Sequence, residues 1–238
     1  MSNHALTGQV DHGVGSRTIL ESHWTWLGIG FAVAFATPFL LADALDVHRD
    51  LFYGLYAAIV ATLFLGWSRA TGYDLVAAIK RRWILALALG LACGAVLAVM
   101  VIRTEDGTSR PDAVTVGAEV AWRGVLYGVT DGLLLSAFPI LVVFAAFADR
   151  RFARHWTGKV AIGALALVAS IALTAVYHAG YSDFRSSKMT KPITGDVIWS
   201  VPTLVTLNPI GAPIAHAGLH VSAVLHSYET DTFLPPHE

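Results

Sequence analysis

The longest apolar run of the chain is Val114–Ala148, VTVGAEVAWRGVLYGVTDGLLLSAFPILVVFAAFA. It exceeds the length of about 20 residues that one transmembrane helix needs. Pro139 and three glycines spaced four residues apart interrupt the run; the glycines are Gly124, Gly128 and Gly132. Because glycine and proline permit a bend at membrane depth, we predict a short helix over Val114–Tyr127 that leads into a span over Asp131–Ala148.

The composition of the whole chain indicates a membrane protein. Of the 238 residues, 55% are hydrophobic and 14% are charged, and the mean hydropathy is +0.59. A soluble domain with a solvated surface is less apolar than this. The net charge is −1, and the basic residues form short clusters between apolar runs, so nucleic acid is excluded as a partner. We predict an all-α, polytopic transmembrane helix bundle whose first partner is the lipid bilayer.

Apolar windows predict six to seven spans. Besides the long run, the predicted spans are Trp24–Ala42, Leu51–Trp67, Trp83–Ile102, Lys159–Tyr177 and a final apolar region, Val197–Leu225. Prolines and Asn208 break the final region, so two short helices are expected there, Thr194–Leu207 and Gly211–Ser227. The predicted organisation is a soluble N-terminal tail over 1–22, a transmembrane domain over 23–227 and a polar C-terminal tail over 228–238.

Basic residues between the spans predict the orientation. They concentrate in the second and fourth connections, as Arg69, Lys80, Arg81 and Arg82 and then as Arg150, Arg151, Arg154 and Lys159. The first and third connections are acidic or mixed. The positive-inside rule therefore places the N-terminus in the cytoplasm, and we predict an integral protein of the cell membrane.

Five ionisable residues stand out because they lie in or against the apolar segments: Glu119, Arg123, His178, His216 and His220. Such side chains are costly inside a membrane and are usually functional. The predicted topology places Glu119, Arg123 and His178 at the outer ends of their segments, and therefore at one depth. His216 and His220 are four residues apart and share a helix face.

This set of residues predicts a metal site. Two imidazoles one helical turn apart can hold one ion, as in HExxH helices. Together with His178 and Glu119 they supply enough ligands for zinc while one position remains for water, which is the pattern of catalytic zinc. We predict His178, His216, His220 and Glu119 as metal ligands, and catalytic roles for the same residues and Arg123.

Three segments resemble the motifs of the CPBP intramembrane proteases, the group that includes CAAX prenyl endopeptidases. Ala118-Glu119-Val-Ala-Trp-Arg123-Gly124 resembles the first motif, in which two adjacent glutamates precede an Arg. His178, in Thr-Ala-Val-Tyr-His, resembles the His of the second motif. His216-Ala-Gly-Leu-His220 resembles the third, a His followed four residues later by Asn or a similar polar residue. The resemblance covers the chain from Val116 onward.

The resemblance implies an intramembrane metal-dependent hydrolase of the peptidase type. In that family a glutamate and two histidines activate a water that attacks a peptide bond, and the polar residue of the third motif stabilises the oxyanion. The implied substrate is a peptide or a membrane protein. This chain has Ala118 where the family has its water-activating glutamate, and His220 where Asn is usual.

Other interpretations of the same residues remain open. Ala118 favours a non-catalytic relative that binds a partner or ligand in the same cavity. Histidines on two helices are also typical of haem ligation. Broken helices are typical of membrane proteins that bind a transported solute. Glu119 and Arg123 are spaced for an intrahelical ion pair. Asp131 would replace the missing base if the helix bends, since on an ideal helix it lies about 120° around from Glu119.

Overall fold

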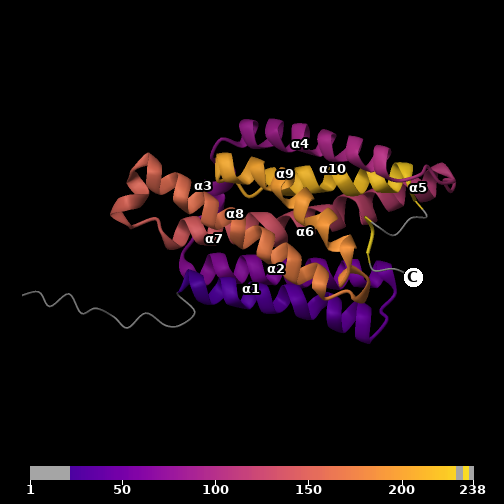
Figure 1. Ribbon diagram of the computed structural model, residues 1–238, viewed down its shortest axis with the longest axis horizontal. Helices are drawn as coiled ribbons and strands as arrows, with labels where there is room; N and C mark the ends of the chain where they lie inside the picture. The colour runs from indigo at the N-terminus through magenta and orange to yellow at the C-terminus, as the bar shows by residue number, and fades with distance from the viewer. Residues whose placement is uncertain (1–21, 229–232, 236–238) are drawn as a thin grey trace, which may run out of the picture.

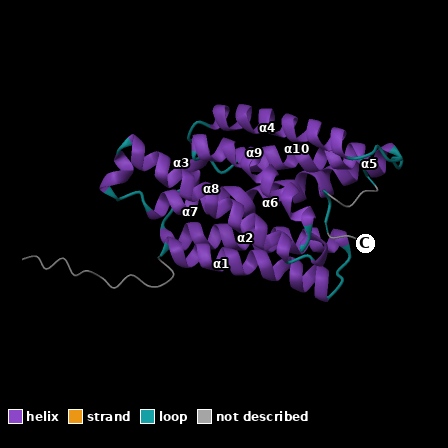
Figure 2. Cartoon of the chain, in the orientation of Figure 1, coloured by secondary structure: helices purple, strands orange, loops and turns teal. Residues whose placement is uncertain are grey.

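The computed structural model describes residues 22–228 and 233–235, and all of its regular elements in these ranges are helices (Figure 2). Five of them are long and apolar enough to cross a membrane. They are α1 with its π-helical extension η2 (His23–Ala44), α2 (Arg49–Thr71), α4 (Trp83–Thr104), a run from α5 to α7 (Ala113–Ala146) and α8 (Trp156–Ala179). The described part of the chain is therefore an all-helical bundle of the kind found in membranes.

The long central run lies between two groups of helices in the bundle. Helices α1 and α2 lie along one side, whereas α4 and α10 (Gly211–His226) lie along the opposite side (Figure 1). Between them run α8 and the five consecutive segments of the central run, which is the most enclosed of the five candidate spans. These segments are α5 (Ala113–Glu119), η3 (Val120–Leu126), α6 (Tyr127–Asp131), η4 (Gly132–Ala137) and α7 (Phe138–Ala146).

The central run is one continuous helix, whereas a short helix followed by a separate span was predicted from its glycines and proline. Two π-helical segments, η3 and η4, keep the chain helical from Ala113 to Ala146. Pro139 lies where η4 passes into α7, inside this helical run, and has no N–H to donate to the preceding turn. One continuous helix therefore includes the predicted helix over Val114–Tyr127 and almost all of the predicted span over Asp131–Ala148.

The three glycines of this run serve close packing against α10. A Cβ added at Gly128 would stand 2.6 Å from the Cα of Ala217, and one added at Gly124 would stand 2.9 Å from Val221. Gly132 meets the backbone of Pro213 in the same way. Small residues at four-residue spacing let two helix backbones approach closely in membranes. This contact fixes α10 alongside the central run.

The end of the chain forms two short antiparallel helices, α9 (Thr190–Thr206) and α10. They begin and end within a few residues of the predicted helices over Thr194–Leu207 and Gly211–Ser227. With 17 and 16 residues they are about 25 Å long. In the turn between them Leu207 adopts a left-handed conformation, with φ 53°, and Asn208 donates hydrogen bonds to the carbonyls of Ile79 and Arg81.

Apolar surface divides between the interior and the outside of the bundle. One buried cluster joins α2, the central run and α8 and is rich in aromatic side chains, among them Tyr53, Tyr56, Trp67, Tyr127 and Tyr177. A second cluster joins α4, α9 and α10. Large apolar side chains such as Ile84 and Val168 point outward and are more than half exposed. Outward apolar side chains are expected of helices that face lipid.

The two predicted tails are described only in part. Residues 1–21 lie outside the described residues, and so does most of the expected polar tail over 228–238. Within that tail Phe233, Leu234 and Pro235 are described, and Leu234 is fully buried against the cluster of α4, α9 and α10. This part of the C-terminal tail therefore packs against the bundle.

Candidate metal centre

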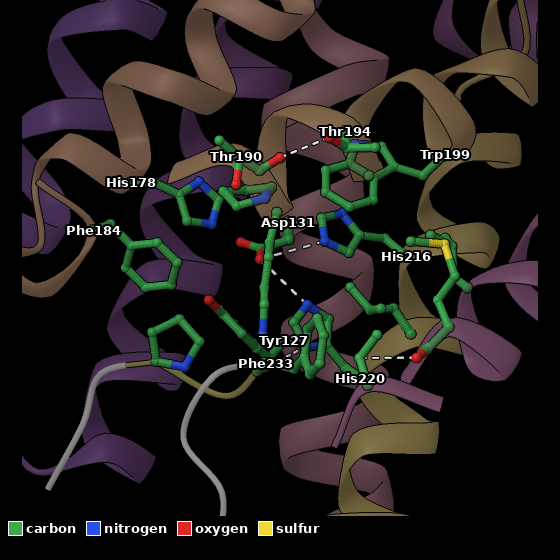
Figure 3. A pocket seen from close by; sticks show the side chains of 18 residues that line it. Tyr127, Asp131, His178, Phe184, Thr190, Thr194, Trp199, His216, His220 and Phe233 are labelled. Carbon is green, nitrogen blue, oxygen red and sulfur yellow. Dashed lines mark hydrogen bonds and ion pairs between the residues drawn. The ribbon is translucent and has the colours of Figure 1, made fainter. Parts of the chain in front are cut away.

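Asp131 lies at the centre of a buried polar site. Its carboxylate is on α6 in the middle of the central run and is 2% exposed. Tyr56 of α2 donates a hydrogen bond of 2.8 Å to Asp131 Oδ1. The other oxygen, Oδ2, faces α10, where it lies 3.8 Å from His216 Nε2 and 3.4 Å from His220 Nε2 (Figure 3).

The hydrogen bond on the far side of His220 determines its tautomer. Nδ1 of His220 lies 2.6 Å from the backbone carbonyl oxygen of Phe233, and a carbonyl can only accept. Nδ1 therefore carries a hydrogen and donates it. In the neutral imidazole Nε2 then presents a lone pair, which is buried without a hydrogen-bond partner and faces the Asp131 carboxylate. Two electron-rich atoms at this distance are stable only if a cation or a proton lies between them.

His216 occupies a slot between flat side chains. Its ring stacks on Trp199 of α9 at a centroid distance of 4.1 Å and on His220 at 4.9 Å. Trp199 is itself held by donating its indole hydrogen to Asp196 at 2.7 Å. His216 is 2% exposed, and its Nδ1 is buried without a hydrogen-bond partner. The stacking fixes the plane of the ring, so Nε2 stays directed toward Asp131.

These three side chains fit a transition-metal ion. One ligand atom from each of Asp131, His216 and His220 lies within 4.8 Å of the other two. Two ligands bound to zinc at tetrahedral angles are about 3.3–3.6 Å apart, which is close to the two separations from Asp131 Oδ2. Tyr56 on the carboxylate and the Phe233 carbonyl on His220 supply the outer hydrogen bonds that orient metal ligands. The buried group could therefore hold a metal ion.

His178 lines the same cavity from the opposite side but is not part of that three-residue group. It ends α8, and its Nδ1 donates to the Thr174 carbonyl at 2.8 Å, so the lone pair is on Nε2. The rings of Tyr177 and Phe184 pack edge-on against it. His178 therefore lines the cavity of His216 and His220, but the group that could hold a metal contains Asp131 in place of the predicted ligands His178 and Glu119.

The cavity beside these residues has a volume of about 240 Å³ and a mainly apolar wall. It lies where α4 and α8 end and α9 begins, and Leu97, Leu219 and Phe233 contribute to its lining. Lys191 lines it as well and forms an ion pair of 3.0 Å with Glu105. A ligand in this cavity would meet apolar side chains on most sides and the histidines and Asp131 at its base.

Glu119 and Arg123 lie elsewhere. They form the i,i+4 ion pair, and Arg123 also binds both carboxylate oxygens of Asp50, at 3.0 and 3.1 Å, near the start of α2. Neither residue lines the cavity. Twelve residues of helix separate Glu119 from Asp131, a rise of about 18 Å along the axis. Glu119 and Arg123 therefore do not share the cavity that His178 lines.

Several residues around the site are not among those predicted from the sequence. The sequence predicts Asp131 only as a substitute base, and it gives no prediction for Tyr56, Tyr127 and Trp199. An intramembrane carboxylate in the middle of an apolar run was the available signal for Asp131. The aromatic residues carry no such signal, because a buried Tyr or Trp in an apolar segment is usually core.

Comparison of the chain with family models, with curated proteins and with solved structures found no match.

Proposed function

We propose that this protein is an intramembrane metal-dependent hydrolase of the peptidase type, with Asp131, His216 and His220 as the metal ligands. The observation that carries the proposal is the pair of Asp131 Oδ2 and His220 Nε2, which are 3.4 Å apart. Because Nδ1 of His220 donates to Phe233, Nε2 has a lone pair to offer. A metal ion satisfies both atoms at once.

Zinc is the proposed metal. Two imidazole nitrogens and one carboxylate oxygen form a ligand set of catalytic zinc, which leaves a position for water. When bound there, zinc lowers the pKa of its water to about 7 and polarises a carbonyl group. The same ligand types also hold non-haem iron, so the identity of the metal distinguishes a hydrolase from an oxygenase.

In this proposal His178 moves protons. Its Nε2 lone pair lies on the cavity wall and its Nδ1 is fixed by Thr174, so the ring can accept a proton at one defined atom. Tyr127 also lines the cavity and packs against His220, and its hydroxyl is hydrogen-bonded to that of Tyr177 at 3.1 Å. Glu119 and Arg123 act as an ion pair that anchors the central run to α2 through Asp50.

The membrane setting completes the proposal. Helices α9 and α10 would join the five candidate spans to make seven, with the N-terminus in the cytoplasm and the cavity toward the outer side of the cell membrane. An apolar cavity within the bundle suits an unwound segment of a membrane protein or an apolar peptide. The resemblance to the CPBP proteases points the same way, since the histidines of the second and third motifs line one cavity and Asp131 supplies a carboxylate that Ala118 cannot.

A second candidate is a non-catalytic relative that binds a peptide in the same cavity. The observation in its favour is that the chain's own Phe233 and Pro235 line the cavity and that the Phe233 carbonyl contacts His220. A backbone segment of this protein therefore already occupies the position a bound peptide would take.

Peptide hydrolysis in proteoliposomes separates the two. We expect the natural protein to cleave members of a library of quenched fluorescent apolar peptides. A chelator should abolish cleavage, and added zinc should restore it. His178→Gln should retain the metal and lose cleavage, whereas the exposed control Lys188→Gln should retain both the metal and the cleavage activity. If the metal-loaded protein binds peptides and cleaves none, the result would support a peptide-binding function and contradict the proposed hydrolase activity.

A further inference from the structure

A second buried polar cluster surrounds Asp196 of α9, on the far side of Trp199 from the histidines. Asp196 is fully buried, and its Oδ1 is approached by hydroxyls and an indole from three helical segments. The approaching groups are Ser136 of η4 at 3.1 Å, Ser170 and Thr174 of α8 at 3.0 and 3.2 Å, and Trp199 and Ser200 of α9 at 2.7 and 3.3 Å. The cluster is thus built almost entirely of oxygen atoms.

The three serine hydroxyls have too few hydrogens for their contacts. Ser136, Ser170 and Ser200 lie 2.7–3.3 Å from one another, each approaches Asp196 Oδ1, and Ser170 also reaches the carbonyl of Leu135. A hydroxyl has one hydrogen to donate. Three hydrogens therefore serve seven contacts, and at least four contacts bring lone pairs together without a hydrogen.

The charge of Asp196 is also unbalanced. Its Oδ2 is buried without a hydrogen-bond partner. Among the described residues, no Lys, Arg or His forms an ion pair with Asp196. An uncompensated carboxylate inside a bundle is strongly unfavourable. One positive charge would stabilise both the closely spaced oxygen atoms and the carboxylate oxygen that has no hydrogen-bond partner.

We infer that Asp196, Ser136, Ser170, Ser200 and Thr174 form a binding site for a monovalent cation, specifically sodium. Carboxylate and hydroxyl oxygens are ligands for hard cations. A single carboxylate balances a single positive charge, whereas calcium sites use several carboxylates. The short separations between the oxygens favour sodium over the larger potassium ion.

The site has a direct structural connection to the candidate metal centre. Trp199 donates to Asp196 through its indole nitrogen and stacks on His216 with its ring. A cation that holds Asp196 in place therefore also holds the ring that orients His216. Sodium binding does not depend on the hydrolase proposal, because none of the cation's ligands belongs to the group of Asp131, His216 and His220.

The test is sodium binding by the full-length protein in detergent. We expect saturable binding of radiolabelled sodium, competed by unlabelled sodium much better than by potassium. The thermal unfolding midpoint should rise when sodium chloride replaces choline chloride at constant ionic strength. Asp196→Asn should abolish both effects and Ser200→Ala should weaken binding at least tenfold. Asp131→Asn should leave both effects intact, which separates this site from the metal centre.

Three results would contradict a sodium site at Asp196. Absence of saturable sodium binding to the natural protein would overturn the inference, and this measurement needs no variant to fold. A midpoint that changes with pH but not with sodium would show that Asp196 is neutralised by a proton instead. An equal response to sodium in Asp196→Asn and in the natural protein would also overturn it.

Discussion

Asp131 Oδ2 and His220 Nε2 lie 3.4 Å apart inside the bundle, and neither atom has a hydrogen to donate to the other when the imidazole is neutral. The helices are held in this arrangement by the close approach of Gly128 and Gly132 to α10. The packing of the bundle thus maintains a contact that favours a positive charge between the two side chains.

Tyr56→Phe removes the hydrogen bond to Asp131 Oδ1 and preserves the aromatic packing. Loss of such an outer hydrogen bond costs about 10–100-fold in metal affinity. We expect weaker zinc binding by that factor in competition with a chelator of known affinity. Tyr53→Phe is the matched control, because the Tyr53 ring stacks on Tyr127 and its hydroxyl has no hydrogen-bond partner. Equal affinity in both variants would argue against Asp131 as a ligand.

Gly128→Ala tests the contact that positions α10. The added Cβ would lie 2.6 Å from the Cα of Ala217, so one helix must move. Such overpacking costs about 1–3 kcal/mol, which should appear as a lower unfolding midpoint in detergent. Gly117→Ala is the control: a Cβ there has no atom within 4 Å, and the change should be neutral or stabilising. A Gly128→Ala protein as stable as this control would contradict the packing described here.

Glu119→Gln separates the ion pair of the central run from the metal centre. It removes the charge that pairs with Arg123 and preserves the shape of the side chain. Because both partners are largely buried, we expect a loss of about 1–3 kcal/mol in the free energy of unfolding. Metal content should not change, since Glu119 does not line the cavity. A fall in metal content as large as that of His216→Ala would restore Glu119 as a ligand.

Metal affinity should fall as the pH falls. A histidine binds a metal only when its coordinating ring nitrogen is free of a proton. Because protons compete with the metal for its ligands, acidification should release the ion and a return to neutral pH should restore it. Metal content measured after equilibrium dialysis between about pH 8 and pH 5 checks this. Retention of all metal at the acidic end, in protein that remains folded, would argue against histidine ligands.

Much of the fold was predictable because apolar length alone defines a membrane helix. The predicted span Trp83–Ile102 corresponds to α4, and Gly211–Ser227 to α10. The continuity of the central run was not predictable from its glycines, because small residues serve both flexibility and close packing. Only the position of α10 shows which of the two applies here.

The site was predicted in part. His216 and His220 share a helix face and line one cavity, whereas His178, also predicted as a metal ligand, lines that cavity outside the group of three possible ligands. The carboxylate in that cavity belongs to Asp131 instead of Glu119. The central run is one continuous helix, so Glu119 lies about 18 Å from Asp131 along the helix axis. Helix periodicity defines the face of a residue, but its neighbours depend on the path of the whole run. The hydrogen bond from His220 to the Phe233 carbonyl could not be predicted, because Phe233 belongs to the C-terminal tail.

The most direct test of the account is the metal content of the purified protein, measured by mass spectrometry for the natural chain and for Asp131→Asn, His216→Ala and His220→Ala. We expect near-stoichiometric zinc in the natural protein and in Tyr53→Phe, and a large loss in each of the three variants. A natural protein that contains no transition metal after purification with added zinc, or variants that hold as much metal as it does, would contradict a metal site formed by Asp131, His216 and His220.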